Sequence, residues 1–301
     1  MQRIRRVAGL LISFALLLVA AAQWAHAGEK LRIYTVSYPL AYFAERIAGD
    51  LAAVTFPAPP DLDPAFWMPD AETIAAYQGA DLILLNGADY AKWLNKASLP
   101  RSRLVDTSRA FRDAYIRETG GVSHSHGPGG EHEHGGTAFT TWLDLDQAAQ
   151  QAGAIAAALA RKRSDAKEQI DRNLESLQGD LRRLDEGLSE ITRMDPGRPL
   201  LASHPVYQYP ARRYGLNLRS VMWEPDELPS EAQWSELEGI LSEHPAKWMI
   251  WEGEPAQQSI ARLRALGLES VVVNPCGNRP ETGDFMSVMS DNVASLQRAF
   301  R

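Results

Sequence analysis

Residues 165–194 read DAKEQIDRNLESLQGDLRRLDEGLSEITRM, and this stretch decides the fold. Apolar side chains recur in it at alternating spacings of four and three residues, at Ile170, Leu174, Leu177, Leu181, Leu184, Leu188 and Ile191. This spacing predicts one continuous apolar stripe on a single helix. At 1.5 Å per residue the helix would be about 45 Å long, enough to span two lobes as a stiff spine. Four heptads would also permit a coiled-coil dimer seam.

Alternating strand-like and helix-like segments flank this helix on both sides. The strand-like segments are 31–36, 52–56, 81–85, 199–203, 218–222, 248–251 and 270–273. The helix-like segments include 41–47, 207–214, 231–243, 258–266 and 284–300. Strands that alternate with helices favour parallel sheets covered by helices. The predicted fold class is therefore α/β, with two lobes of mainly parallel sheet joined by a long rigid backbone helix.

The changes in these patterns also divide the chain into segments. We expect a signal peptide at 1–27, an N-terminal α/β lobe at 28–144 that includes a His-rich loop at 121–136, a central helical segment with the long linking helix at 145–195, and a C-terminal α/β lobe at 196–301. A chain of this length exceeds the usual size of one domain, which agrees with two separate lobes.

The first 27 residues have the pattern of a secretory signal. Three arginines within the first six residues precede an apolar run at 7–22, and AHA at 25–27 forms a small-x-small cleavage site. The apolar run is short for a membrane anchor. We therefore expect cleavage near Ala27/Gly28 and a periplasmic protein. We expect no lipoprotein, because the single cysteine, Cys276, lies far from the cleavage point.

The net charge argues against nucleic acid as a partner. The chain has 31 basic and 38 acidic side chains, a formal net charge of −7, and loss of the leader would remove only basic ones. A surface that binds nucleic acid needs an excess of basic side chains. With a single cysteine, the chain cannot contain an internal disulfide.

The segment 124–136, HSHGPGGEHEHGG, contains His124, His126, His132 and His134, four of the chain's seven histidines. It has no large apolar side chain, so we expect a mobile surface loop. Neutral imidazole is a good ligand for zinc, copper and nickel, and a glycine-rich loop can wrap several rings around one ion. The cluster therefore indicates metal handling. A solvated linker that binds nothing is the alternative.

Catalytic motifs are missing from the sequence. It has no nucleophile elbow, no H-E-x-x-H pair, no phosphate loop and no glycine-rich nucleotide fingerprint. We therefore expect a binding protein and not an enzyme.

Four local motifs point to one family when they are taken together. They are LLASH at 200–204 followed by YQYPARRYGL at 207–216, WLD at 142–144, ADLILLNG at 80–87 and NPCG at 274–277. With the leader, the paired lobes, the long helix and the His-rich loop before it, the chain resembles the periplasmic zinc and manganese binding proteins of metal ABC importers. The resemblance implies two α/β lobes bridged by a rigid helix, with a metal held in the cleft between them.

The resemblance also implies four ligand positions, occupied by three histidines and one carboxylate. In this sequence only His204 keeps its histidine. Ala65, Thr140 and Asn274 stand at the other three positions, and of these Asn274 offers only a neutral carbonyl oxygen. A lone imidazole with amide support would bind zinc poorly, so other donors are required.

Several side chains could supply the missing donors. Glu252 and Glu254 follow a predicted strand, and loops at strand ends of open α/β sheets form ligand crevices. The imidazoles of 124–136 could swing in, and Asp61 and Asp63 are further oxygen donors near the first lost position. The expected metal ligands are His204, Glu252, Asn274, Glu254, His124, His126, His132 and His134.

Three tryptophans, Trp67, Trp142 and Trp251, lie beside the ligand positions that the resemblance implies, and we expect them to line the cleft. Tryptophan faces and carboxylates could bind an organic cation or a metal chelate in place of a bare ion. Tryptophans beside strands are more often part of the core, which is the simpler interpretation.

Together these features predict a periplasmic solute-binding protein that captures a transition metal, with Zn²⁺ as the expected ion and Mn²⁺ or another divalent metal as the alternative. It would deliver the ion to the membrane permease of a metal ABC importer, with a metallochaperone as a further partner, and we expect a monomer. Two other functions stay open. One is an accessory metal scavenger that acts through the His-rich loop, and the other is a binder of a metal chelate or organic cation in an aromatic-lined cleft.

Overall fold

The computed structural model describes residues 29–117, 122–125, 131–134 and 136–301. The predicted leader, 1–27, and the predicted ligand His126 lie outside these residues. Among the helices of the described ranges, none has the length and apolar character needed to cross a membrane.

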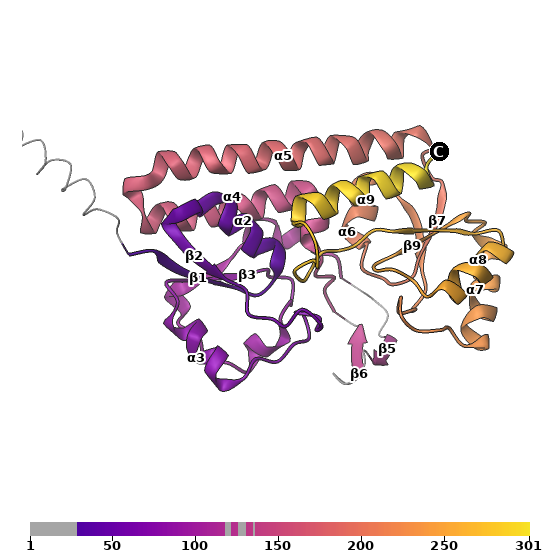
Figure 1. The fold of residues 1–301 in the computed structure, drawn as a ribbon, viewed down its shortest axis with the longest axis horizontal. Coiled ribbons are helices and arrows are strands. Elements are labelled where there is room, and N and C mark those ends of the chain that lie inside the picture. The colour runs from indigo at the N-terminus through magenta and orange to yellow at the C-terminus, as the bar shows by residue number, and fades with distance from the viewer. Residues whose placement is uncertain (1–28, 118–121, 126–130, 135) are drawn as a thin grey trace, which may run out of the picture.

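Two parallel sheets form the two lobes, which confirms the predicted fold class (Figure 1). The strands of the first sheet are β1 (Leu31–Thr35), β2 (Ala52–Thr55), β3 (Leu82–Leu85) and β4 (Leu104–Asp106). Those of the second are β7 (Pro199–Ala202), β8 (Asn217–Ser220), β9 (Trp248–Trp251) and β10 (Glu269–Val272). Their spatial orders, β2-β1-β3-β4 and β8-β7-β9-β10, are the same topology used twice. Every neighbouring pair is parallel.

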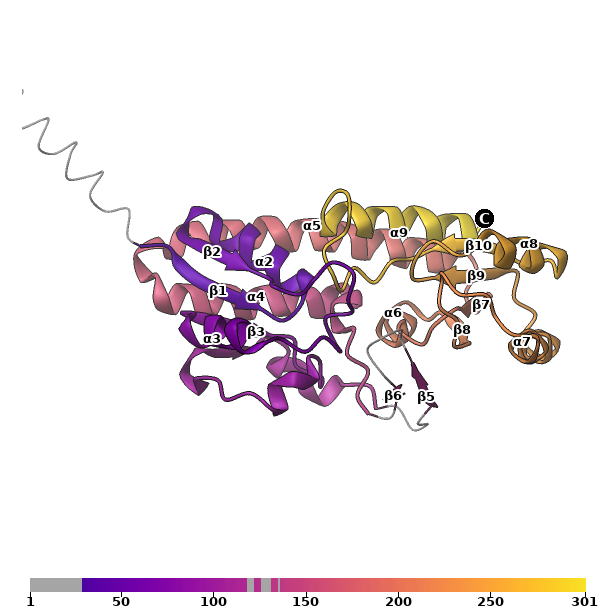
Figure 2. The ribbon, with the colours of Figure 1, turned by 60° about the horizontal axis from the view of Figure 1, so that its bottom comes forward.

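Eight α-helices of the described chain cover these sheets. They are α2 (Tyr38–Ala48), α3 (Ala71–Gly79), α4 (Leu145–Lys162), α5 (Lys167–Met194), α6 (Gln208–Tyr214), α7 (Glu231–Glu243), α8 (Gln257–Ala265) and α9 (Phe285–Ala299). In Figures 1 and 2, α4, α5 and α9 form a layer along one side of both lobes, and α5 runs the length of that layer. The predicted spine is therefore present.

The apolar stripe of α5 is buried within the chain itself. Ile170, Leu177 and Leu181 have no exposed surface, and α5 packs against α2, α4 and α9. These leucines belong to one continuous cluster that reaches from Ile33 in the first sheet to Ile250 in the second. A dimer seam is therefore not needed to explain the stripe. A separate cluster under α7 and α8 covers the other face of the second sheet.

Polar side chains fix where the helices begin. The Asp144 carboxylate accepts hydrogen bonds from the backbone N–H groups of Asp146 and Gln147 at the start of α4. Asp284 and Ser287 form a capping box at the start of α9. Such caps satisfy N–H groups that the first helical turn leaves without partners. Asp144 therefore links the chain segment that ends the first lobe to the central helices.

Two sequence expectations differ from the structure. The described parts of the His-rich segment, expected as a loop, form two antiparallel strands, β5 (Val122–Ser125) and β6 (Glu131–His134), with the backbone of His124 opposite that of His132. The sequence of this segment does not alternate apolar with polar residues, the pattern that would have predicted strands. The sequence also gave no indication of β4, which is only three residues long and half-buried.

We expect Leu177→Ala to lower the free energy of unfolding by about 2–5 kcal/mol, because truncating a fully buried leucine leaves a cavity. Urea unfolding measures the change. The loss should not depend on protein concentration, since the stripe packs within one chain. A loss that grows on dilution would support the coiled-coil seam instead. Ser176→Ala, on the exposed face of the same helix, is the control and should change stability by less than about 0.5 kcal/mol.

Candidate metal centre

Three donor side chains converge in the second lobe. The Nδ1 atom of His204 lies 3.6 Å from a carboxylate oxygen of Glu224 and 3.7 Å from one of Glu252. One ligand atom from each of the three lies within 4.8 Å of the others. His204 is 2% exposed, whereas Glu224 and Glu252 are 19% and 23% exposed, so the cluster has a buried base and an accessible rim.

The topology of the second sheet explains why these donors meet. His204 follows β7, Glu224 follows β8, and Glu252 follows β9, three strands that are neighbours in the sheet. Because the strands are parallel, their carboxyl ends lie at one edge. The chain passes to opposite sides of β7 on its way to β8 and to β9, and such a switch point is where open α/β sheets bind ligands.

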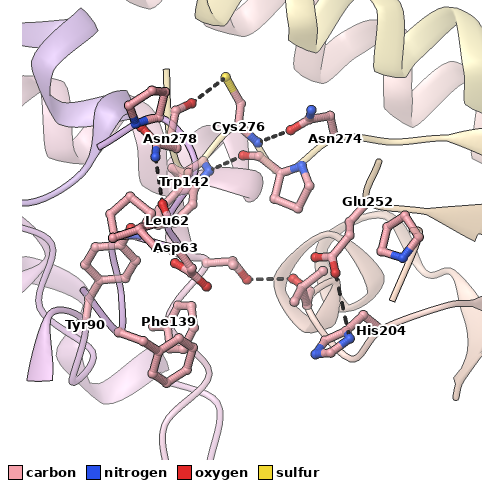
Figure 3. A pocket seen from close by; sticks show the side chains of 18 of the residues that line it. Leu62, Asp63, Tyr90, Phe139, Trp142, His204, Glu252, Asn274, Cys276 and Asn278 are labelled. Atoms are coloured by element: carbon pink, nitrogen blue, oxygen red, sulfur yellow. Dashed lines mark hydrogen bonds and ion pairs between the residues drawn. The ribbon is translucent and has the colours of Figure 1, made fainter. Parts of the chain in front are cut away.

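A cavity of about 520 Å³ lies between this cluster and the first lobe. Figure 3 shows His204 and Glu252 on the side of the second lobe, with Tyr90, Phe139 and Asp63 facing them from the first. Phe66 and Trp142 also line the first-lobe side, and the rings of Tyr90 and Phe139 meet edge to face with centroids 5.3 Å apart. The cavity therefore has the donor cluster on its second-lobe wall, and aromatic rings together with Asp63 on its first-lobe wall.

Of the four ligand positions implied by the family resemblance, His204 belongs to the cluster and the other three do not. Ala65 is buried and has no donor atom in its side chain. The Thr140 hydroxyl donates to the carbonyl of Val206 at 2.6 Å. Asn274 lines the cavity, but its side-chain oxygen accepts a hydrogen bond from the backbone N–H of Cys276 at 2.7 Å. The expectation of Asn274 as a ligand is therefore not supported by its placement.

The other predicted residues are distributed as follows. Glu254 is exposed and lines a different hollow, beside α9, so it is not brought to His204. Trp142 lines the cavity as expected. Trp251 is fully buried beside Trp223 in the core under α7 and α8, so the expectation that it lines the cleft is wrong. Trp67 is half-buried and is not among the described residues that line the cavity.

The side chains of the predicted loop ligands lie outside what the structure describes. The backbones of His124, His132 and His134 lie in the β5–β6 hairpin, and His126 lies outside the described residues. Within the described chain, the group of metal-type donors is His204 with Glu224 and Glu252.

Sequence reasoning missed Glu224. The same argument that selected Glu252, a carboxylate just after a strand of the second sheet, also applies to Glu224, four residues beyond the end of β8.

Cys276 lines the cavity but is poorly suited to bind metal. Burial raises the pKa of its thiol to about 12, and Asp284 adds to the effect. Only a thiolate is a good metal ligand, and this thiol stays protonated at neutral pH.

The loop that carries Tyr90 has an unusual backbone. Gly87, Ala88, Asp89 and Ala91 all have left-handed φ angles, between 49° and 74°. A Cβ atom at Gly87 would lie 2.0 Å from the Ser108 hydroxyl oxygen, so only glycine fits there. Left-handed conformations cost about 1–2 kcal/mol for residues with a side chain, and such strain concentrates at functional sites. The loop places the Tyr90 ring in the cavity wall.

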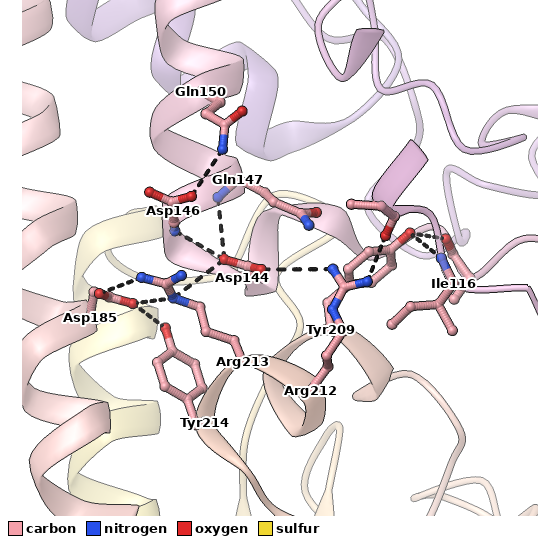
Figure 4. A network of polar contacts seen from close by, with 12 residues as sticks. Ile116, Asp144, Asp146, Gln147, Gln150, Asp185, Tyr209, Arg212, Arg213 and Tyr214 are labelled. Atoms are coloured by element: carbon pink, nitrogen blue, oxygen red, sulfur yellow. Dashed lines mark hydrogen bonds and ion pairs between the residues drawn. The ribbon is translucent and has the colours of Figure 1, made fainter. Parts of the chain in front are cut away.

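A charged network behind the cavity ties α6 to the central helices (Figure 4). Arg213 of α6 donates two hydrogen bonds to Asp185 of α5, at 2.6 and 2.7 Å, and lies 3.4 Å from the helix-capping carboxylate of Asp144. Tyr214 donates a third hydrogen bond to Asp185 at 2.8 Å. Since α6 follows the loop of His204, this network helps to fix the second-lobe wall.

Burial and hydrogen bonds shift the pKa values of Asp144 and Asp185 in opposite directions. Burial raises the pKa of Asp144, although the hydrogen bonds from the backbone oppose it. Burial also acts to raise the pKa of Asp185, but the hydrogen bonds from Arg213 and Tyr214 outweigh it and lower that pKa from its ordinary value. Arg213 is thus the cation that keeps Asp185 ionised.

Two α/β lobes joined by a shared helical layer, with a donor cluster in the cavity between them, define a two-lobed solute-binding protein. Residues 33–299 match the family described as zinc-uptake complex component A, periplasmic, and the chain belongs to this family. The family resemblance inferred from the local motifs is therefore confirmed.

Similar proteins are known from several bacteria. The chain is 26% identical over 305 residues to the zinc-binding lipoprotein AdcA of Streptococcus pneumoniae, a match that covers 94% of this chain and 58% of AdcA. It is 26% identical over 289 residues to the high-affinity zinc uptake system protein ZnuA of Bacillus subtilis, covering 90% of this chain and 88% of ZnuA. The crystal structure of the zinc-bound ZnuA-like domain of AdcA superposes with a TM-score of 0.75 at 21% identity, over 90% of this chain and 99% of that domain.

We expect Arg213→Ala to lower the free energy of unfolding by about 2–4 kcal/mol at pH 7, because it leaves two largely buried carboxylates without their cation. The pKa of Asp185 is lower in the folded protein than in the unfolded chain, so its contribution is present above the unfolded-state pKa and is lost as the pH falls through the folded-state pKa. The difference between wild type and variant should therefore shrink in acid.

Urea unfolding at several pH values between 7 and 3 measures this difference. Arg219→Ala, which removes an exposed ion pair with Glu243, is the control and should cost less than about 1 kcal/mol. A difference between wild type and Arg213→Ala that stays constant down to pH 3 would contradict the role given to Asp185.

Proposed function

We propose that this protein is the extracytoplasmic solute-binding component of a zinc importer and that it holds one Zn²⁺ on His204, Glu224 and Glu252. The observation that carries the proposal is the convergence of these three donors at the carboxyl ends of adjacent strands. Membership of the zinc-uptake family supports zinc as the cargo. The similarity to AdcA and ZnuA, proteins named for zinc, supports it further.

The geometry of the cluster suits zinc. Two ligands about 2.1 Å from a tetrahedral zinc lie about 3.4 Å apart. The distances of 3.6 and 3.7 Å from His204 to the two carboxylates are close to that value, so small side-chain movements would close the site around an ion. Three protein ligands leave a fourth position for water or another small ligand.

Manganese is the second candidate, because two of the three donors are carboxylates. Oxygen donors suit Mn²⁺, whereas imidazole suits Zn²⁺. At a site of fixed ligands, however, divalent zinc binds more tightly than manganese by the usual order of affinities. We therefore propose zinc as the preferred ion and expect weaker binding of manganese at the same three residues.

Delivery to a membrane permease completes the proposed function. Solute-binding proteins of importers present their cargo to a membrane partner, and the family's description as part of an uptake complex supports such a partner here. The leader-like residues 1–27 support export. AdcA is named a lipoprotein, but Cys276 of this chain is buried in the second lobe, so we do not propose it as a site of lipid attachment.

We propose no catalytic activity. The described cavity contains an imidazole and carboxylates, but these converge as a ligand set within 4.8 Å of one another, which suits an ion more than a bound substrate flanked by acid and base. The family's description as an uptake component supports binding and release in place of turnover.

We expect His204→Ala, Glu224→Gln and Glu252→Gln each to weaken zinc binding by about 100-fold or more, because changes in outer-shell groups alone cost 10- to 100-fold. Competition with a zinc-sensitive fluorescent chelator measures the affinity. Glu254→Gln is the matched control, since this carboxylate lies only two residues from Glu252 but outside the cluster, and it should change affinity by less than about twofold. Full affinity in Glu224→Gln would refute the assignment of that ligand.

A second measurement separates the cluster from the His-rich segment. We expect replacement of His124, His126, His132 and His134 by Asn to leave one tightly bound zinc per chain and to remove any weaker additional ions. Metal analysis by mass spectrometry after dialysis gives the stoichiometry. Loss of the tight ion in this variant, with its retention in His204→Ala, would favour a metal scavenger that acts through the His-rich segment.

A further inference from the structure

The first lobe has a second hollow, separate from the cavity that holds the candidate metal ligands. It has a volume of about 740 Å³ and lies between β4, the short helix Arg109–Ala114 that follows it, and one face of α4. Its described lining has no residue in common with that of the cavity. We call this hollow the β4 groove, and its lining includes β4 itself, Arg109, Arg112, Ala154, Ala157 and Arg161.

The edge of the first sheet forms one side of the β4 groove. β4 is the last strand in the order of its sheet and pairs with β3 on one side only. The N–H of Thr107 donates to the carbonyl of Leu85 at 3.0 Å, and Leu85 lies opposite Asp106. In a parallel ladder with this register, Asp106 and Leu104 direct their own N–H and C=O groups away from β3. Such an edge can pair with one more extended segment.

The lining of the groove has an excess of positive charge. It contains the three exposed arginines Arg109, Arg112 and Arg161, and Asp106 is the one carboxylate among the described residues that line it. Arg112 donates to Asp106 at 2.8 Å, so this pair is neutral. The guanidinium groups of Arg109 and Arg161 make no hydrogen bond or ion pair with any other described residue. Two cations are therefore available to a partner.

Local structure explains one of these two arginines but not the other. Arg161 lies in the last turn of α4, where a cation interacts favourably with the carbonyl groups that end the helix. Arg109 begins its short helix, where a positive charge gains nothing from the helix. The chain as a whole has a formal net charge of −7, so a groove with excess positive charge differs from the rest of the molecule. Charge complementarity favours a partner with carboxylates.

We propose that the β4 groove docks an extended, acidic segment of a partner protein. The segment pairs as an additional strand with the outward backbone groups of Leu104 and Asp106, and its carboxylates bind Arg109 and Arg161. Guanidinium groups suit this role because their paired N–H groups match the two oxygens of a carboxylate. A lipid headgroup would supply negative charge but no main chain to pair with the strand edge. The surface is independent of the proposed zinc site and goes beyond the proposed function.

Short labelled peptides test the proposal on the full chain. The probe is a peptide that alternates glutamate with valine, and fluorescence anisotropy measures its binding. One comparison peptide has lysine in place of glutamate, and another keeps the glutamates but has methylated backbone nitrogens that cannot donate to a strand edge. We expect both comparison peptides to bind at least about 10-fold more weakly than the probe, because one loses the charge complementarity and the other the strand pairing.

Charge reversal in the groove gives the matched variants. Arg109→Glu and Arg161→Glu should each weaken binding of the acidic peptide by about 3- to 10-fold, since each replaces an attraction with a repulsion. Arg182→Glu is the control, because Arg182 is an exposed arginine of α5 outside the groove, and it should change binding by less than about twofold. All three variants should retain the zinc affinity of the wild type, which shows that they are folded.

Three outcomes would overturn the proposal. The acidic peptide may fail to bind, or Arg109→Glu and Arg161→Glu may leave its binding unchanged. Equal binding of the methylated peptide would show attraction by charge without strand addition. Vesicles of phosphatidylglycerol provide the remaining arm: binding to them that Arg109→Glu abolishes, together with no binding of the peptide, would assign the groove to a membrane surface instead.

Discussion

One continuous apolar core, shared by both lobes and sealed by the stripe of α5, is the constraint on which the rest of the structure depends. Leu177 and Leu181 lie in the same cluster as Ile33 of the first sheet and Ile250 of the second. Exposing a buried leucine costs about 1.5–3 kcal/mol. Parting the lobes along this layer would expose many buried apolar side chains, each at a similar cost in free energy. The lobes therefore behave as two halves of one body, and the distance between the cavity walls is set by the core behind them.

Because the lobes are held rigidly, it matters that the candidate ligands come from one lobe only. All three candidate ligands, His204, Glu224 and Glu252, come from the second lobe, where one parallel sheet edge brings them together. The first lobe contributes rings and a constrained loop at Gly87–Ala91. An ion bound to a single lobe gains nothing from drawing the lobes together. Hydrogen bonds of Thr140 and Trp142 join the lobes beside the cavity and agree with that arrangement.

Much of the fold, and less of the site, could be predicted from the sequence. The 3-4 spacing of leucines gave α5, and the alternation of strands and helices gave two parallel sheets, because periodicity reports directly on which faces are buried. Glu252 followed from the rule for strand ends. Glu224 fits the same rule, but only the tertiary order of β9, β7 and β8 shows that it shares an edge with Glu252. Trp251 was placed in the cleft wrongly, since β9 is buried on both faces and its sequence does not show which core each side chain enters.

The open coordination position has a consequence for kinetics. A fixed pair of lobes cannot release its cargo by swinging apart, so the dwell time of an ion at His204, Glu224 and Glu252 would be set by ligand exchange at the metal itself. With three protein atoms bound, an incoming donor can enter the coordination sphere before any of the three departs. Hand-over would then be associative: the acceptor's own ligands would determine its rate, and a passing molecule without suitable donors would leave the ion in place.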